Sequence, residues 1–285
     1  MKALGTIDSR LLIFGGPYGN LAATEAMRSA ARALDISADH IICTGDLVAY
    51  CAEPQQTVDL IRDWGIHVIM GNCEESLAQS QMDCGCGFEA GSACSALSVA
   101  WYEYANQHVS LDSRRWMNDL PRSIELQIKN HRFRVVHASV TSINQFIFAS
   151  TPVETKRRQI SEADVDCVIG GHSGIPFGQN IEEMLWLNAG VIGLPPNDGS
   201  SDGWYMLLEP NETGFRVSWH RLSYDAKISH VSTKKAGMGE YAQTLIDGLW
   251  PSMDVLPEQE QSNRGNRLEL PDIKVESSQL AVNAG

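Results

Sequence analysis

The stretch TGDLVAYCAEPQQTVDLI, Thr44 to Ile61, connects the end of an apolar run to the start of a helical pattern. Together with the residues before it, the run reads HIICTGD and predicts a buried strand that ends near Asp46. Pro54 lies where the first turn of the next helix is expected, and Gly65 follows the expected end of that helix. A carboxylate therefore stands directly after a strand, in the loop that leads to a helix.

The same alternation extends in both directions along the chain. LLIF, residues 11–14, predicts an earlier strand, and residues 20–36 predict a helix with Asn20 as its cap. IHVIMGN, residues 66–72, predicts a further strand. Strands that alternate with helices at this spacing imply right-handed crossovers and a largely parallel sheet.

The pattern changes in the second half of the chain. SIELQIK and FRVVHAS, residues 123–129 and 133–139, predict a hairpin of two strands, and a helix over residues 151–163 leads to another strand over 166–172. Mostly strands follow, up to about residue 223. This change from alternating strands and helices to consecutive strands predicts an α/β fold of two packed sheets flanked by helices, in the order αββα.

The domain organisation follows from these patterns and from composition. We expect one domain over residues 1–235, interrupted by a Cys- and Gly-rich insert at residues 81–94 that cannot hold regular structure for long. We expect a C-terminal helix over residues 236–250. Residues 251–285 are polar and have few aromatics, which predicts a disordered tail.

Charge and composition limit the possible partners. The formal net charge of −13 over 285 residues argues against a nucleic-acid surface or an anionic membrane surface, because both rely on Lys and Arg to neutralise phosphate. No signal peptide or apolar run of membrane-spanning length is apparent, so we expect a cytoplasmic protein. In that compartment the seven cysteines are expected to be thiols or metal ligands in place of disulfides.

Four polar residues each follow a predicted buried strand and lie beside a small residue. They are Asp46, Asn72, His137 and His172. Taken singly, each also has a purely structural interpretation, as a turn, a helix start or a core histidine. Because open α/β sheets place their ligands at the carboxyl ends of strands, these four could meet there. Their two oxygen and two nitrogen donors suit a Zn, Mn or Fe ion.

With these residues and the segments GHSGIPFGQN and LNAGVIGLP, the sequence resembles the calcineurin-like metallophosphoesterases from about Leu11 to Leu208. It is most similar to their small bacterial branch of phosphodiesterases and diadenosine-tetraphosphatase-like proteins. The resemblance implies a phosphoric ester hydrolase that uses metal-activated water on a small phosphorylated substrate or nucleotide. Matched to the family's motifs, Asp46, Asn72, His137 and His172 are the ligands of its second metal ion.

The family's first metal site is not reproduced. Gly16 and Tyr18 stand where the family has the ligands of its D-x-H motif, and Gly174 replaces the closing histidine of G-H-x-H. We therefore expect one divalent ion per chain, Mn, Fe or Zn.

The family's catalytic histidine is also replaced, by Cys73, while the adjacent Glu74 is kept. Cys73, Glu74 and Tyr18 are the candidate catalytic residues. The backbone of Gly15 and Gly16 is a candidate phosphate-binding turn in place of the missing ion.

Four cysteines, Cys73, Cys84, Cys86 and Cys94, are close together in the sequence. They could form a soft-metal or redox cluster. Their spacing lacks the C-x2-C pair of ordinary zinc sites, so structural thiols in a lid loop are the other interpretation. The basic run at residues 156–158 could attract phosphate or form a solvated helix face.

Three functional hypotheses remain open at this level. The first is a phosphatase or phosphodiesterase with an altered, mononuclear site. The second is a catalytically inactive family member that acts as a metal- or nucleotide-binding sensor. The third is a thiol redox module built on the same scaffold.

Overall fold

The alternation of strands and helices predicted for the first half of the chain is present in a computed structural model, which describes residues 1–276. Its strands are β1 (Lys2–Thr6), β2 (Leu11–Phe14), β3 (Ile41–Cys43), β4 (His67–Val68), β5 (Ser123–Ile128), β6 (His131–Val136), β7 (Cys167–Gly170), β8 (Phe177–Ile181), β9 (Met184–Asn188), β10 (Gly203–Pro210), β11 (Gly214–Leu222) and β12 (Ile273–Glu276). Its helices are α1 (Leu21–Ala33), α2 (Pro54–Trp64), α3 (Asn72–Ala78), α4 (Ala93–His108), α5 (Leu111–Asn118), α6 (Val153–Ala163), α7 (Ala226–Lys235), α8 (Gly239–Asp247) and α9 (Glu258–Gln261), with a 3₁₀ turn at Ala38–His40.

The strands of the described residues form two mixed sheets. One has the order β1-β5-β6-β7-β9-β8 and the other the order β12-β11-β10-β2-β3-β4. Strands β2, β3 and β4 are parallel to one another, as are β6, β7 and β9. The parallel strands therefore bring the loops that follow them to shared edges of the two sheets.

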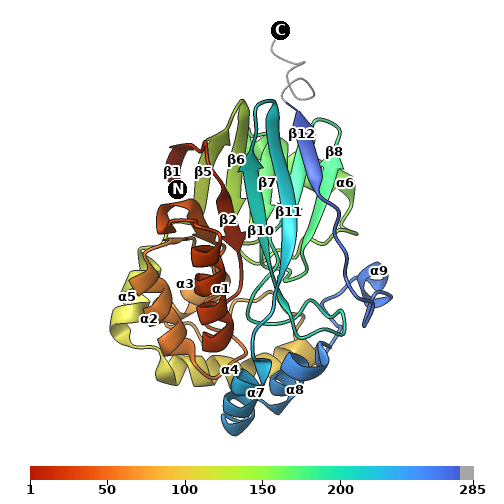
Figure 1. Ribbon diagram of the computed structural model, residues 1–285. Coiled ribbons are helices and arrows are strands. Elements are labelled where there is room, and N and C mark those ends of the chain that lie inside the picture. Colours follow the sequence, from red (N-terminus) through yellow and green to blue (C-terminus); the bar gives the residue numbers. More distant parts are fainter. Residues whose placement is uncertain (277–285) are drawn as a thin grey trace.

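The two sheets pack face to face with helices outside, which confirms the predicted αββα architecture (Figure 1). Alternate residues of β2 serve two different cores. Leu11 and Ile13 lie in the apolar layer between the sheets, together with Phe133 of the opposite sheet. Leu12 and Phe14 point to the other face, where they belong to the cluster that contains buried residues of α1 and α2.

Local sequence explains where the first helices begin and end. The side chain of Asn20 accepts a hydrogen bond from the backbone N–H of Ala23 and caps α1. Helix α2 has Pro54 in its first turn and ends at Gly65, whose φ of 73° is in the left-handed region that favours glycine. The predicted helix bounds are therefore close to those observed.

The C-terminal region differs from the prediction. The disordered tail predicted for residues 251–285 is wrong for 251–276, because β12 pairs with β11 over Ile273–Glu276 and α9 precedes it. Val275 is buried in the core between the sheets, and this burial stabilises the end of the chain. The remainder of the predicted tail, residues 277–285, lies outside the described residues.

The insert and its flanks agree more closely with the sequence. Most of residues 81–94 is irregular, and α4 begins at Ala93. The C-terminal helix predicted over residues 236–250 is the shorter α8. The strand β1 and the helix α7 have no counterpart in the sequence prediction; β1 is an exposed edge strand, so no run of apolar residues marks it.

Candidate metal centre

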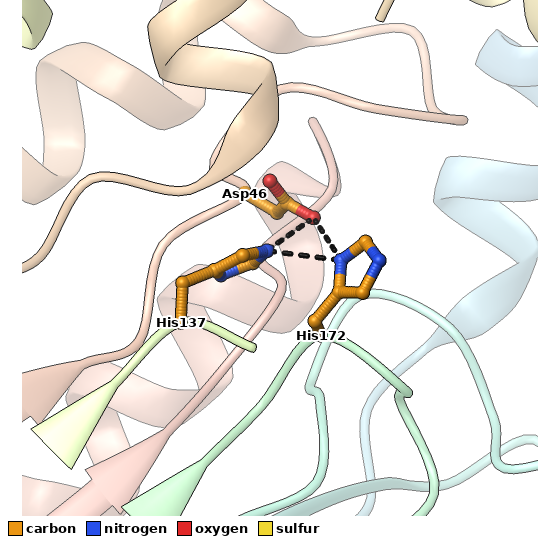
Figure 2. Close-up of side chains that lie close together, drawn as sticks. All are labelled: Asp46, His137 and His172. Carbon is orange, nitrogen blue, oxygen red and sulfur yellow. Dashed lines mark hydrogen bonds and ion pairs between the residues drawn. The ribbon is translucent and has the colours of Figure 1, made fainter. Parts of the chain in front are cut away.

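Three titratable side chains meet where the two sheets adjoin. Asp46 follows β3, His137 follows β6 and His172 follows β7. Nε2 of His137 lies 3.3 Å from Oδ2 of Asp46 and 3.0 Å from Nδ1 of His172 (Figure 2). All three residues are buried. In the part of the chain that the structure describes, they are the one group of three His, Cys, Asp or Glu side chains close enough to hold a metal ion.

Asn72 completes the group of four that the sequence singles out. It is the first residue of α3, and its Oδ1 lies 3.0 Å from Nε2 of His137. Its Nδ2 points the other way and donates to the carbonyl of Cys84 at 2.9 Å. The amide is therefore oriented with its oxygen toward His137.

One hydrogen bond of His137 points away from the centre and determines the tautomer of the ring. Nδ1 of His137 lies 2.6 Å from the carbonyl oxygen of Thr44, which can only accept, so Nδ1 carries a proton. In the neutral ring Nε2 then has a lone pair, and it faces the carboxylate of Asp46 and the amide oxygen of Asn72. Such a convergence of electron pairs attracts a cation or a proton to its centre.

The pKa values of Asp46, His137 and His172 are shifted by their burial and by the charges that they place on one another. Burial disfavours the charged form of His137, but the charge and hydrogen bond of Asp46 outweigh it and raise the pKa of the imidazole. Burial likewise opposes ionisation of Asp46, yet His137 and His172 lower the pKa of its carboxyl group. Burial lowers the pKa of His172. Without a metal ion, a proton on Nδ1 of His172 or on Nε2 of His137 would separate these electron pairs.

The donor set fits a transition-metal ion. Donors bound tetrahedrally to zinc at about 2.0 to 2.1 Å are about 3.3 Å from one another. The separations that involve His137 range from 3.0 to 3.3 Å, and Nδ1 of His172 lies 3.8 Å from Oδ2 of Asp46. The oxygen and imidazole donors therefore have the spacing and the chemistry to share one ion of Zn, Mn or Fe.

The side chain of Glu74 does not line the centre but holds the backbone around it in place. Its carboxylate accepts hydrogen bonds from the backbone N–H groups of Asp46 at 2.8 Å, Leu47 at 2.7 Å and Gly71 at 2.9 Å. Burial and the nearby charge of Asp46 raise the pKa of Glu74 to about 7. The side chain thus fixes the loop after β3 and the start of α3 in relation to each other.

Cys73 is held in its neutral form. Its backbone N–H donates to Oδ1 of Asp46 at 3.2 Å, and its thiol is buried. Burial and the charges of Asp46 and Glu74 raise the pKa of the thiol well above its ordinary value. The thiolate that would make Cys73 a nucleophile is therefore disfavoured in this environment.

The predicted phosphate-binding turn does not have free amides. The N–H of Gly15 donates to the carbonyl of Gly190 at 2.9 Å, and the N–H of Gly16 donates to the carbonyl of Gly45 at 3.1 Å. The expectation that these two glycines bind phosphate through their backbone is wrong in this structure, because the turn is tied to neighbouring loops. The ring of Tyr18 is buried and packs over Gly16.

The four predicted thiols do not form one cluster. Cys84 and Cys86 form a disulfide, so the expectation that all seven cysteines are thiols or metal ligands is wrong for this pair. Cys73 and Cys94 are free and buried. Asn72 connects the disulfide to the centre, because its Nδ2 also lies 3.4 Å from Sγ of Cys86. The insert therefore contacts a candidate ligand directly, although it adds no donor of its own to the group of three.

The predicted basic run is divided between two environments. Lys156 is fully buried, and its Nζ donates to the carbonyl of Ala149 at 2.8 Å and to the side chain of Gln179. The suggestion that residues 156–158 form a solvated face or attract phosphate is therefore wrong for Lys156. The sequence did not reveal the roles of Thr44 and Glu74. Thr44 contacts His137 through its backbone carbonyl, and Glu74 contacts backbone N–H groups through its carboxylate. Short patterns such as TGD or NCE contain no signal for either contact.

Comparison with known proteins agrees with this architecture. Residues 20–213 match the model of the calcineurin-like phosphoesterase superfamily domain. An uncharacterized protein of Methanocaldococcus jannaschii is 24% identical over 251 residues, which cover 82% of this chain and 96% of that protein. No membrane-spanning candidate is found among the helices of the described residues.

Two solved structures share the fold. A metallophosphoesterase from Sphaerobacter thermophilus has a TM-score of 0.66 at 20% identity, covering 85% of this chain and 100% of that one. A hypothetical protein from Pyrococcus horikoshii OT3 has a TM-score of 0.72 at 17% identity, covering 85% of this chain and 99% of that one. Because the family model matches most of the chain, this protein belongs to the calcineurin-like phosphoesterase superfamily.

Proposed function

We propose that this member of the calcineurin-like phosphoesterase superfamily is a metal-dependent phosphatase or phosphodiesterase with a mononuclear centre. Asp46, Asn72, His137 and His172 would hold the one divalent ion, Mn, Fe or Zn. The observation that carries the proposal is the position of His137. Its Nδ1 proton is committed to Thr44, while its Nε2 lies among oxygen and nitrogen donors 3.0 to 3.3 Å away.

When bound, such an ion would polarise a phosphoryl oxygen and lower the pKa of a water molecule toward neutrality. The residues of this chain provide the geometry around it. The carbonyl of Thr44 fixes the tautomer of His137, as partners beyond the ligands do in other metal sites. Glu74 holds the backbone of Asp46, so the carboxylate and the imidazole keep their relative positions without a rearrangement on binding.

The substrate would be a small phosphorylated molecule or nucleotide, and the location cytoplasmic, as expected from the sequence. Cys73 and Tyr18 would act as neutral groups near the phosphate in this scheme. Burial and the charge of Asp46 raise the pKa of both side chains, so each would keep its proton at neutral pH.

Two observations keep alternative functions in view. Gly16, Tyr18 and Gly174 provide no imidazole or carboxylate for a first metal ion, which favours an inactive metal- or nucleotide-binding module. The Cys84–Cys86 disulfide beside Asn72 favours a thiol redox sensor. Each alternative uses the same scaffold but predicts a different response to substitution.

Metal analysis and an activity screen on one preparation distinguish these functions. We expect one equivalent of Mn, Fe or Zn per chain and hydrolysis of bis-p-nitrophenyl phosphate, both lost in His137→Ala. His131→Ala is the matched control, because His131 is also buried but lies at the opposite end of β6. It should keep its metal.

Two results would contradict the proposal. Metal without turnover under any divalent ion would favour the inactive module. Metal that survives His137→Ala but is lost in the double variant Cys84→Ser, Cys86→Ser would favour a thiol centre.

A further inference from the structure

A cavity of about 60 Å³ opens beside His172. Since a single water molecule needs roughly 10 to 15 Å³, the cavity has room for a small organic group. Its walls come from separate parts of the chain: the loops that contain Tyr18 and Phe146, helix α4 with Leu97, and the segment after α8 with Trp250 and Val255. Most of these segments are far from one another in sequence.

The walls are aromatic and aliphatic. The ring of Phe146 lies 4.3 Å from the ring of His172 and 6.1 Å from that of Phe88. Two further lining residues, Tyr50 and Tyr18, contact each other with ring centres 4.7 Å apart. The described side chains that line the cavity include no Asp, Glu, Lys or Arg. An anionic phosphate would therefore gain nothing in this cavity, whereas the edge of an uncharged ring would gain from burial in it. The cavity, at about 60 Å³, is smaller than the roughly 150 Å³ of a cavity that holds benzene, so the ring would enter it only in part.

The cavity coincides with the departures from the family pattern. Tyr18 and Gly174, which stand where two first-site ligands are expected, both line it. A Cβ atom at Gly174 would lie only 3.5 Å from the ring of Trp250, so this indole packs against the space that a histidine side chain would enter. Trp250 is fixed there, because its Nε1 donates to the carbonyl of Pro195 at 2.7 Å and its backbone N–H donates to Asn197 at 2.8 Å.

Trp250 and Val255 also lie beyond residues 20–213, the part that matches the family model. Residues beyond the segment that matches the family model thus help to line this cavity. Gly174 and Tyr18 stand where the family has metal ligands, and the C-terminal segment packs beside them. In this chain the region is therefore apolar, where the family's motifs would place charged or metal-binding groups.

We propose that this cavity binds an uncharged aromatic ring of the substrate, so that the enzyme acts on aryl esters of phosphate. This inference rests on the proposed function, since the phosphoryl group would lie at Asp46, His137 and His172 while the ring enters beside His172. A carbocyclic ring is favoured over a nucleobase, because most of the lining is aromatic or aliphatic and the described lining residues include no Asp, Asn, Glu, Gln, Lys or Arg to pair with the polar edge of a base. The polar side chains that remain are His172, Ser173, Ser252 and the tyrosine hydroxyls. The selectivity would arise from apolar burial and ring packing.

Phenylphosphonate and methylphosphonate test this directly. They carry the same charged group, cannot be hydrolysed and differ in the substituent on phosphorus. Calorimetric titration of the metal-loaded protein should show phenylphosphonate binding about tenfold or more tightly, as expected for burial of a ring of that size. Equal affinities would overturn the proposal.

Substitution at the rim tests the location. In Val255→Trp the added indole should fill the cavity and bring the two dissociation constants close together. Leu97→Trp fills the cavity from α4 and serves if the first variant does not fold. The control is Val231→Trp on α7, where the side chain is 64% exposed and is not part of the cavity lining, and it should keep the wild-type preference.

The outcomes separate this inference from the function on which it rests. Binding of methylphosphonate with no preference for phenyl would overturn the aromatic site and leave the metal centre standing. No binding of either phosphonate to metal-loaded protein would overturn both. Adenosine 5′-monophosphate that binds more tightly than phenylphosphonate, and loses this advantage in Val255→Trp, would overturn the choice of a carbocyclic ring.

Discussion

The carboxylate of Glu74 accepts a hydrogen bond from the backbone N–H of Asp46 at 2.8 Å. The two residues are 28 positions apart in the sequence. The φ of Asp46 is 58°, in the left-handed region that residues other than glycine adopt at an energetic cost. The two further bonds of Glu74, to Leu47 and Gly71, hold this backbone in place. The side chain of Glu74, which does not face the centre, thus holds the backbone of the candidate ligand Asp46 in position.

Removing this support should weaken both folding and the centre. Glu74→Ala leaves three buried N–H groups without their acceptor, so we expect the free energy of unfolding to fall by about 3 kcal/mol, measured in urea. Metal occupancy should fall with it. Glu74→Gln keeps one carbonyl acceptor and should lose less stability. An alanine variant with wild-type stability and metal content would contradict the positioning role.

Alanine substitutions at two glycines should have unequal effects. At Gly16, a Cβ atom would lie 2.5 Å from the ring of Tyr18 and 2.7 Å from Val191, whereas at Gly174 the nearest atom is 3.5 Å away. Both have positive φ, so Gly174→Ala should cost about 1 kcal/mol of backbone strain. Gly16→Ala adds overpacking and should cost roughly 3 kcal/mol. Denaturant midpoints of the two variants measure the difference, and equal losses would contradict it.

Lys156 should make stability depend on pH in the alkaline range. Burial lowers its pKa to about 8, with Glu260 opposing the shift. An unfolded lysine has a pKa near 10.4, so between these values the unfolded chain binds more protons and the free energy of unfolding rises with pH.

The rise attributable to Lys156 is limited to about 1.4 kcal/mol per pH unit, the value for one proton. Lys156→Met removes it, so the difference in unfolding free energy between the wild type and this variant should increase in favour of the wild type from pH 8 to 10. Urea titrations at several pH values measure this difference. Parallel curves for the two proteins would show that Lys156 does not titrate in this range.

The disulfide predicts a definite thiol count. Five of the seven cysteines are free and buried, and Cys84 and Cys86 are paired. Protein unfolded in guanidinium without reductant should therefore react with five equivalents of a thiol reagent per chain, and with seven after reduction. The double variant Cys84→Ser, Cys86→Ser should give five in both conditions. Seven thiols without reduction would show that the pair is not oxidised.

Much of the architecture could be predicted from local pattern. The apolar runs before Asp46 and His137 end in polar residues at strand ends, and Asn20, Pro54 and Gly65 mark helix boundaries close to those observed. The edge strand β1 and the final strand β12 could not be predicted in this way. Neither is a run of buried residues, and β12 is ordered through its pairing with β11.

The sequence by itself determined the order of most strands and helices, the position of four donors after strands and the loss of ligands at Gly16, Tyr18 and Gly174, because each depends on residue type and short spacing. Tertiary structure decided what these positions became. Glu74 holds the loop of Asp46 through hydrogen bonds to its backbone, Lys156 is buried, and Trp250 lines an apolar cavity beside His172. Such contacts join residues that are 23, 28 and 55 positions apart for Lys156, Glu74 and Trp250, and only the packing of the two sheets and their helices brings them within reach.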